Sequence, residues 1–130
     1  MSTAEQSVRA FLDAVASEKL TPSGGAVAAV SGASGTALCE MVCVHTVRAD
    51  EYDDGETELA EISAALNTHR EQLLKLADED MGAVEQMQST FEESSSSAER
   101  QPALQRATEL PLEVAERCLD VLEYAETVVA

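Results

Sequence analysis

The sequence predicts an all-α protein, an antiparallel bundle of four to five helices in a single domain covering residues 1–130. Apolar residues recur at steps of three and four in the long segments, which is the period of a helix. Aromatic residues make up only 3% of the chain and Trp is absent, so Ala, Val, Leu and Met must form the core. No segment shows the alternation of apolar and polar residues that is typical of a strand.

The first helix should begin near Thr3, because Gln6 follows three residues later in the pattern of a capping box. Its apolar face consists of four residues at helical spacing, which are Val8, Phe11, Leu12 and Val15. Residues 17–23 form a loop, because Pro22 cannot continue a helix through this point.

The second helix is expected in the stretch TPSGGAVAAVSGASGTALCEMVCVHT, residues 21–46, which carries a single charge, Glu40. Small residues recur at every fourth position in two adjacent ridges, namely Gly24, Ala28, Gly32 and Thr36, and Gly25, Ala29, Ala33 and Ala37. Because small ridges allow another helix to approach closely, we expect this long helix to be the central one. Its weak hydropathy argues against a membrane span.

The third helix is expected from Glu56 to about Ser94, after an acidic turn at residues 49–55. Its seam alternates steps of three and four through Leu59, Ile62, Leu66, His69, Leu73, Leu76, Asp80, Ala83 and Met87. The fourth helix should start near Gln101, with Pro102 at its first position. We expect Pro111 to kink this helix or divide it in two.

The acidic composition excludes several partners. The chain has 25 acidic and 8 basic residues and a net charge of −17, so its surface repels nucleic acid phosphates and anionic lipids. Two interpretations remain, an acidic interaction module and a cytosolic protein adapted to molar salt, and the scattered acids and scarce lysines favour the second. The chain shows no signal peptide and its three cysteines fit reduced thiols, so a cytoplasmic location is expected.

Asp80 is the sharpest candidate for chemistry. A carboxylate in an apolar seam is costly unless it is paired or functional, and burial would prepare it for proton transfer. The alternative is a slight rotation of the helix that leaves Asp80 at the rim while Met81 or Val84 packs. His69 is the second exception, and a lone histidine on an apolar face is more often a packed or interface residue than a catalyst.

A metal site is not expected. Cys39 and Cys43 share a helical face, but His45 points elsewhere and thiols in a small-residue helix usually pack. The Glu-x-x-His pairs of carboxylate-bridged metal bundles are absent from the sequence. The Gly24-Gly25 pair opens a helix whose free N–H groups can bind a polar ligand, although such a pair is usually only a turn.

Four elements in order resemble the formiminotransferase-cyclodeaminase C-terminal family, which includes methenyltetrahydrofolate cyclohydrolases. The stretch quoted above is similar to that family's Pro-Thr-Pro-Gly-Gly-Gly-Ser-Val-Ala-Ala segment and the small-residue helix after it. SVRAFLDAVAS resembles the first helix, LLKLADEDMGAV the Leu-x-x-Asp-x-x-Ala-Phe element, and ATELPLEVAERCLDVL the Ala-Thr-x-x-Pro-Leu segment. Ser23 and Ala26 replace a glycine and a serine of the family pattern, and the chain is expected to be shortened at its C-terminal end.

The resemblance implies a helical homodimer that acts on a tetrahydrofolate derivative without a metal. The reaction would be hydrolysis of 5,10-methenyltetrahydrofolate to 10-formyltetrahydrofolate or cyclodeamination of formiminotetrahydrofolate. It places the catalytic carboxylate on Asp80 and substrate binding on Ser23, Gly24 and Gly25. Three cations are candidates for the folate glutamate, namely Arg48, Lys75 and Arg106. The alternatives are a shortened, catalytically inactive helical dimer with a binding or regulatory role, and an acidic scaffold for a basic partner.

Overall fold

The structure, a computed structural model, describes residues 2–49, 56–93 and 96–129. Within these ranges the chain forms a 3₁₀ helix, η1 (Thr3–Glu5), and four α-helices and no strand. The α-helices are α1 (Val8–Val15), α2 (Gly24–Ala49), α3 (Glu56–Glu92) and α4 (Ser97–Val129). The prediction of an all-α antiparallel bundle is therefore confirmed. The acidic turn expected at residues 49–55 lies almost wholly outside the described residues.

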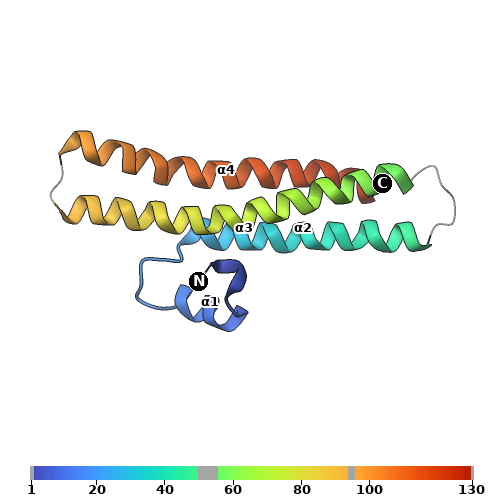
Figure 1. Ribbon diagram of the computed structural model, residues 1–130, viewed down its shortest axis with the longest axis horizontal. Helices are drawn as coiled ribbons and strands as arrows, with labels where there is room; N and C mark the ends of the chain where they lie inside the picture. The colour runs from blue at the N-terminus through green and yellow to red at the C-terminus, as the bar shows by residue number, and fades with distance from the viewer. Residues whose placement is uncertain (1, 50–55, 94–95, 130) are drawn as a thin grey trace.

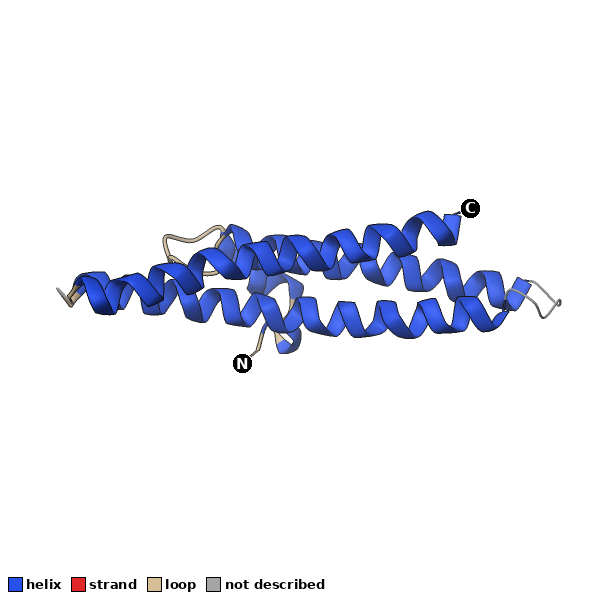
Figure 2. Cartoon of the chain, turned by 90° about the horizontal axis from the view of Figure 1, so that it is seen from above, coloured by secondary structure: helices blue, strands red, loops and turns tan. Residues whose placement is uncertain are grey.

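Three long helices lie side by side, and α3 runs antiparallel to α2 and α4 (Figures 1 and 2). Because α3 runs back between them, α2 and α4 point in the same direction (Figure 1). The helix α3 packs extensively against both α2 and α4, whereas α2 and α4 contact each other less. The central helix is thus α3, and the prediction that the small-residue helix would be central is wrong.

The core is divided into two clusters along the bundle. The first cluster is built from small α2 residues and the leucines of α3 and α4, and comprises Ala26, Ala29, Ala33, Leu73, Leu76, Ala77, Ala83, Leu110 and Val114. The second comprises Cys43, Ile62, Leu66 and Val121. The large side chains come from α3 and α4, which explains why α3 rather than α2 occupies the middle: its leucine seam offers more surface to bury.

The helix α2 is apolar but only partly covered. Residues 24–46 have the length and composition of a membrane-crossing helix, with a mean hydropathy of 1.6 and only 22% of the window buried. The core helix of a soluble protein has the same properties, and α2 packs on α3 (Figure 1). Its outer face exposes large side chains, which are Leu38, Met41, Val42 and Val44.

The N-terminal segment begins later than the sequence predicts. Ser7, rather than Thr3, caps α1, because its hydroxyl oxygen accepts a hydrogen bond from Ala10 N–H at 3.0 Å. Thr3 instead contacts α3, and Phe11 is the only buried residue of α1. The expected apolar face is therefore only partly used, since Val8 and Leu12 are exposed.

Neither proline of α4 breaks this helix. It begins at Ser97, ahead of the expected start near Gln101, and Pro102 lies inside it rather than at its first position. Pro111 lies in its middle, yet the helix continues to Val129 and is not divided in two. Leu110 and Val114, which lie on either side of Pro111, are packed in the first cluster. This packing holds the helix together across the proline.

Beyond Asp80, α3 continues from Met81 to Glu92 alongside the first turns of α4. The helix α2 does not extend there, so the two helices form a hairpin that projects past it (Figure 1). We call the described residues of this part, 86–93 and 96–104, the overhang. The guanidinium of Arg100 stacks over the Phe91 ring within it, 5.4 Å from the ring centroid.

Candidate active site

Asp80 lies on the buried face of α3 and is only 1% exposed. Ala77 and Ala83, one turn away on either side, belong to the first cluster, whereas Met81 and Val84 are half-buried. The prediction that Asp80 is buried in the seam is confirmed, and the rim alternative is wrong. A buried carboxylate is costly unless its oxygens find hydrogen-bond donors, so its partners decide what it can do.

Two residues at the start of α2 meet this carboxylate. The Ser23 hydroxyl donates a hydrogen bond to Oδ2 of Asp80 at 3.1 Å. Gly25 faces the same group so closely that a Cβ at this position would lie 2.7 Å from Cγ and 2.7 Å from Oδ2 of Asp80. Glycine at 25 is therefore required by the close approach of Asp80, not by the backbone conformation, since no described glycine has a positive φ.

Gly24 differs from its neighbour. A Cβ at Gly24 would meet no atom within 4 Å, and the residue is exposed. Ser23 and Gly25 thus contact Asp80, whereas Gly24 lies beside them and faces open space. The three residues at the start of α2 and the carboxylate on α3 form one compact group, in which one side is closed by Asp80 and the other is accessible.

Long-range hydrogen bonds hold this part of α3 to the N-terminal segment. Asp78 accepts from the backbone N–H of Thr3 at 2.9 Å and from its hydroxyl at 2.6 Å. The Thr21 hydroxyl donates to Glu85 at 2.9 Å. These residues flank Asp80 on both sides, and sequence analysis missed them. No sequence pattern marks them, because each bond joins residues that are far apart in the chain.

The candidate cations have different surroundings. Arg106 pairs with Glu79, the residue before Asp80 on α3, at 3.4 Å and with Glu113 of α4 at 3.3 Å. Lys75 is exposed and lies 4.0 Å from Glu79. The side chain of Arg48 lies outside the described residues. Both described cations thus pair with Glu79, and Arg106 reaches it from α4 at the shorter distance.

His69 contacts two side chains of α4, Arg117 and Tyr124. Its Nδ1 lies 3.3 Å from a guanidinium nitrogen of Arg117, and its ring centroid is 5.9 Å from that of Tyr124. It is half-buried, and the groove beside it, of about 360 Å³, is lined by acids and by Tyr124 and Thr127 of α4. His69 and Asp80 therefore lie in different parts of the bundle.

The cysteines pack as expected. Cys43 belongs to the second cluster and Cys39 packs against it, whereas His45 is exposed. Burial raises the pKa of the Cys43 thiol, and the nearby Cys39 and Glu40 raise it further. In the part of the chain that the structure describes, no three His, Cys, Asp or Glu side chains lie close enough together to hold a metal ion. That the protein works without a metal ion remains a prediction from the sequence.

The sequence profile of the formiminotransferase-cyclodeaminase family matches residues 7–130. The chain belongs to this family. The family resemblance inferred from the glycine turn, the Asp80 element and the Pro111 segment is thereby confirmed.

Relatives in this family include folate enzymes. A methenyltetrahydrofolate cyclohydrolase of Methylorubrum extorquens is 35% identical over 131 residues, which cover 95% of this chain and 63% of that protein. The formimidoyltransferase-cyclodeaminase of Rattus norvegicus is 30% identical over 123 residues, 88% of this chain and 23% of the rat protein. The chain thus spans less than two thirds of the length of both relatives.

A solved structure shares the fold. The crystal structure of a formiminotetrahydrofolate cyclodeaminase from Thermotoga maritima superimposes with a TM-score of 0.80 at 31% sequence identity. The match covers 96% of this chain and 73% of that chain. The three-helix arrangement that places Asp80 against the start of α2 is therefore built on the fold of the formiminotransferase-cyclodeaminase family.

Proposed function

We propose that this protein is a folate one-carbon enzyme that hydrolyses 5,10-methenyltetrahydrofolate to 10-formyltetrahydrofolate. The observation that carries the proposal is the buried Asp80 carboxylate, which Ser23 and Gly25 hold at the start of α2. The relative of highest identity among those described above bears the name of this activity. Cyclodeamination, the activity named for the other two proteins, uses the same cationic carbon and would require the same carboxylate.

Asp80 fits the chemistry of the first step. The methenyl carbon carries a delocalised positive charge between two nitrogens, so a fixed carboxylate stabilises the bound cation and accepts a proton from the attacking water. The water oxygen bonds to the methenyl carbon, its proton moves to Asp80, and the π electron pair returns to nitrogen. The neutral adduct that results has lost the charge of the substrate.

The second step opens the ring. The bond between that carbon and one nitrogen breaks, its electron pair stays on the nitrogen, and the nitrogen takes the proton from Asp80. The hydroxyl group loses its proton to water, which leaves a formyl group on the other nitrogen. One water is consumed and one proton is released, so Asp80 is regenerated as a carboxylate for the next turnover.

The open side of the glycine turn supplies an approach for the substrate. Gly24 is exposed and has free space where a side chain would stand, so a flat ring system can lie against the backbone there. Arg106, joined to α3 through Glu79, is the cation that we assign to the folate glutamate. Lys75 is more exposed and less fixed.

The decisive experiment follows the loss of methenyltetrahydrofolate absorbance in molar potassium chloride. Wild-type protein should accelerate the decay, and Asp80→Asn should not, while its circular dichroism remains helical. Full activity in Asp80→Asn would remove Asp80 from the mechanism. Decay no faster than buffer with folded wild type would contradict the enzyme and leave the catalytically inactive helical dimer, which would then bind a reduced folate without turnover.

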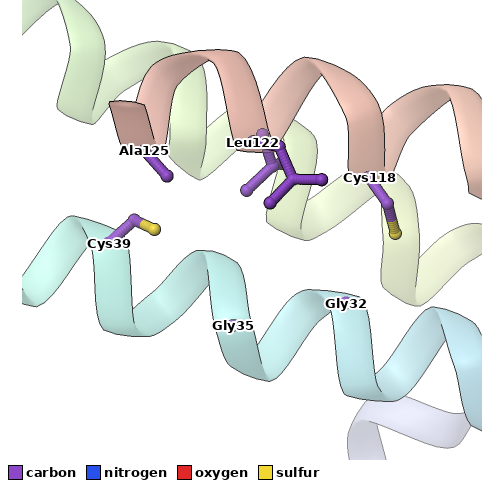
Figure 3. A pocket seen from close by; sticks show the side chains of 7 residues that line it. Gly32, Gly35, Cys39, Cys118, Leu122 and Ala125 are labelled. Carbon is purple, nitrogen blue, oxygen red and sulfur yellow. The ribbon is translucent and has the colours of Figure 1, made fainter. Parts of the chain in front are cut away.

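A second copy of the chain is the partner that we propose for the outer face of α2 and α4. A groove of about 230 Å³ runs between these helices and is lined by Gly32, Gly35, Cys39, Cys118, Val121, Leu122 and Ala125 (Figure 3). Leu122, which lines it, is 60% exposed. Because the chain carries a charge of −17, this uncharged face is where two copies can meet with least repulsion.

The dimer proposal is tested by the mass in solution. Light scattering should give twice the chain mass for wild type in molar salt, and Leu122→Glu should give a monomer. Leu20→Glu introduces the same charge at another exposed leucine, outside this face, and should leave the dimer intact. A monomeric wild type at micromolar concentration would overturn the homodimer.

The composition supports two further proposals, a molar-salt environment and a cytoplasmic location. Self-repulsion of 25 acids against 8 bases is screened over about 3 Å in 1 M salt, so the folded state should gain stability steeply with salt. A melting temperature independent of potassium chloride between 0.1 and 2 M would contradict the adaptation to salt. Nucleic acid and membranes are not proposed as partners.

A further inference from the structure

Pro111 changes the hydrogen bonding of α4 at one carbonyl. In an α-helix each carbonyl accepts from the N–H four residues later, and Pro111 lies inside α4 but has no N–H. The carbonyl of Ala107 therefore lacks its helical donor, although the helix continues through this point. The proline ring also pushes this carbonyl away from the helix axis, which turns the oxygen toward a partner outside the helix.

This carbonyl lies at the level of Asp80 along the bundle. Ala107 packs against the first cluster, which contains Ala77 and Ala83, the residues one turn on either side of Asp80. Its neighbour Arg106 pairs with Glu79, the residue before Asp80, at 3.4 Å. The turn of α4 that holds Ala107 is thus adjacent to the turn of α3 that holds Asp80.

The register of α2 and α4 leads to the same place. A Cβ on Gly32 would lie 2.8 Å from the Cys118 sulfur, so these two positions face each other on two helices that run in the same direction. One heptad earlier on each helix stand Gly25 and Pro111. Gly25 contacts Asp80. From this register we infer that the turn of α4 with Pro111 faces the start of α2 beside the carboxylate.

We propose that the Ala107 carbonyl is the second acceptor for the water that attacks the substrate, an inference that rests on the proposed hydrolysis. The water has two O–H groups. One donates to Asp80, which removes that proton as the oxygen bonds to the methenyl carbon. The other donates to the Ala107 carbonyl, which fixes the direction of the attacking lone pair without competing for the proton, because an amide oxygen is a very weak base.

Pro111 is then a positioning residue, and it acts by withholding an N–H group. Its ring is exposed, and a helix former would be more stable in its place. A helix that packs a core on both sides of this residue thus contains a proline at its centre because the proline leaves the Ala107 carbonyl to the water.

The test is Pro111→Ala, which supplies the missing donor to Ala107. We expect a higher melting temperature together with a kcat that falls roughly tenfold or more, while KM changes less than about twofold, since water rather than substrate loses a contact. Pro102→Ala is the matched control, because it restores a helical N–H in the same helix but in the overhang. It should raise stability and leave kcat unchanged.

The outcomes are distinguishable. A Pro111→Ala enzyme with the wild-type kcat overturns the role of Ala107 and leaves the hydrolase in place. A raised KM with unchanged kcat also overturns it, because the carbonyl would then bind substrate. Wild-type protein without turnover refutes the proposed function and this inference with it. Pro111→Ser, which also carries an N–H, repeats the test if alanine disturbs packing.

Discussion

The two polar residues in the seam of α3 lie in contrasting surroundings. Asp80 is 1% exposed, and the start of α2 closes over it with a serine hydroxyl and a glycine that leaves room for the carboxylate. His69, three turns earlier, is half-buried and shares its surroundings with Arg117 and Tyr124. A break in an apolar seam thus has two physical origins. At Asp80 the start of α2 packs directly on the polar group. At His69 the residue lies at the edge of the core, where its side chain is partly exposed.

The largest expected difference follows from removing each polar group in turn. Asp80→Asn should lower kcat by about 10² to 10⁴-fold, the usual contribution of a general base, without loss of helicity. His69→Gln should change kcat less than about twofold, because no part of the proposed reaction reaches it. Parallel absorbance assays measure both. Comparable losses in the two variants would show that the seam as a whole, not Asp80, supports turnover.

The next difference is between two glycines. Gly25→Ala forces a Cβ against the Asp80 carboxylate and should destabilise the fold by about 1–3 kcal/mol while displacing the general base. Gly82→Ala, on the exposed side of α3 with no atom within 4 Å of the new Cβ, should stabilise it by about 0.5–1 kcal/mol. Urea unfolding of the two variants is the measurement. A neutral Gly25→Ala would mean that Asp80 moves aside freely and is not held in place.

The smallest effect concerns pH at the His69 end of the bundle. Burial raises the pKa of the Cys43 thiol above its ordinary value of 9.0. The unfolded chain releases that proton near pH 9, whereas the folded protein retains it. The contribution of this thiol to the free energy of unfolding is therefore fully present below pH 9 and is lost as the pH rises toward the folded pKa. The slope is at most about 1.4 kcal/mol per pH unit for one thiol. Melting curves between pH 8 and 10.5 should show a shallower decline for Cys43→Ala than for wild type.

Sequence patterns identify the helices and the buried face of α3 because periodicity is a property of one helix at a time. The seam places Asp80 inside before any contact is known. The central position of α3, the hydrogen bond from Ser23 and the contact with Gly25 depend instead on how two helices are placed in register, and a single sequence does not fix that. The same reason hides the bond between Thr3 and Asp78, which holds the N-terminal segment on α3 instead of starting a helix.

The overhang has a consequence for how the molecule opens. Two helices without a third bury little surface, and the large side chains of Phe91 and Leu104 are exposed in this part. Its backbone amides should exchange with deuterium well before those around Leu73 and Leu110, which are fully buried. Opening would therefore begin in the overhang and stop at Ala83, where the first cluster starts. The Asp80 carboxylate would then lie one turn inside the part that unfolds only with the whole protein, next to a part that unfolds locally.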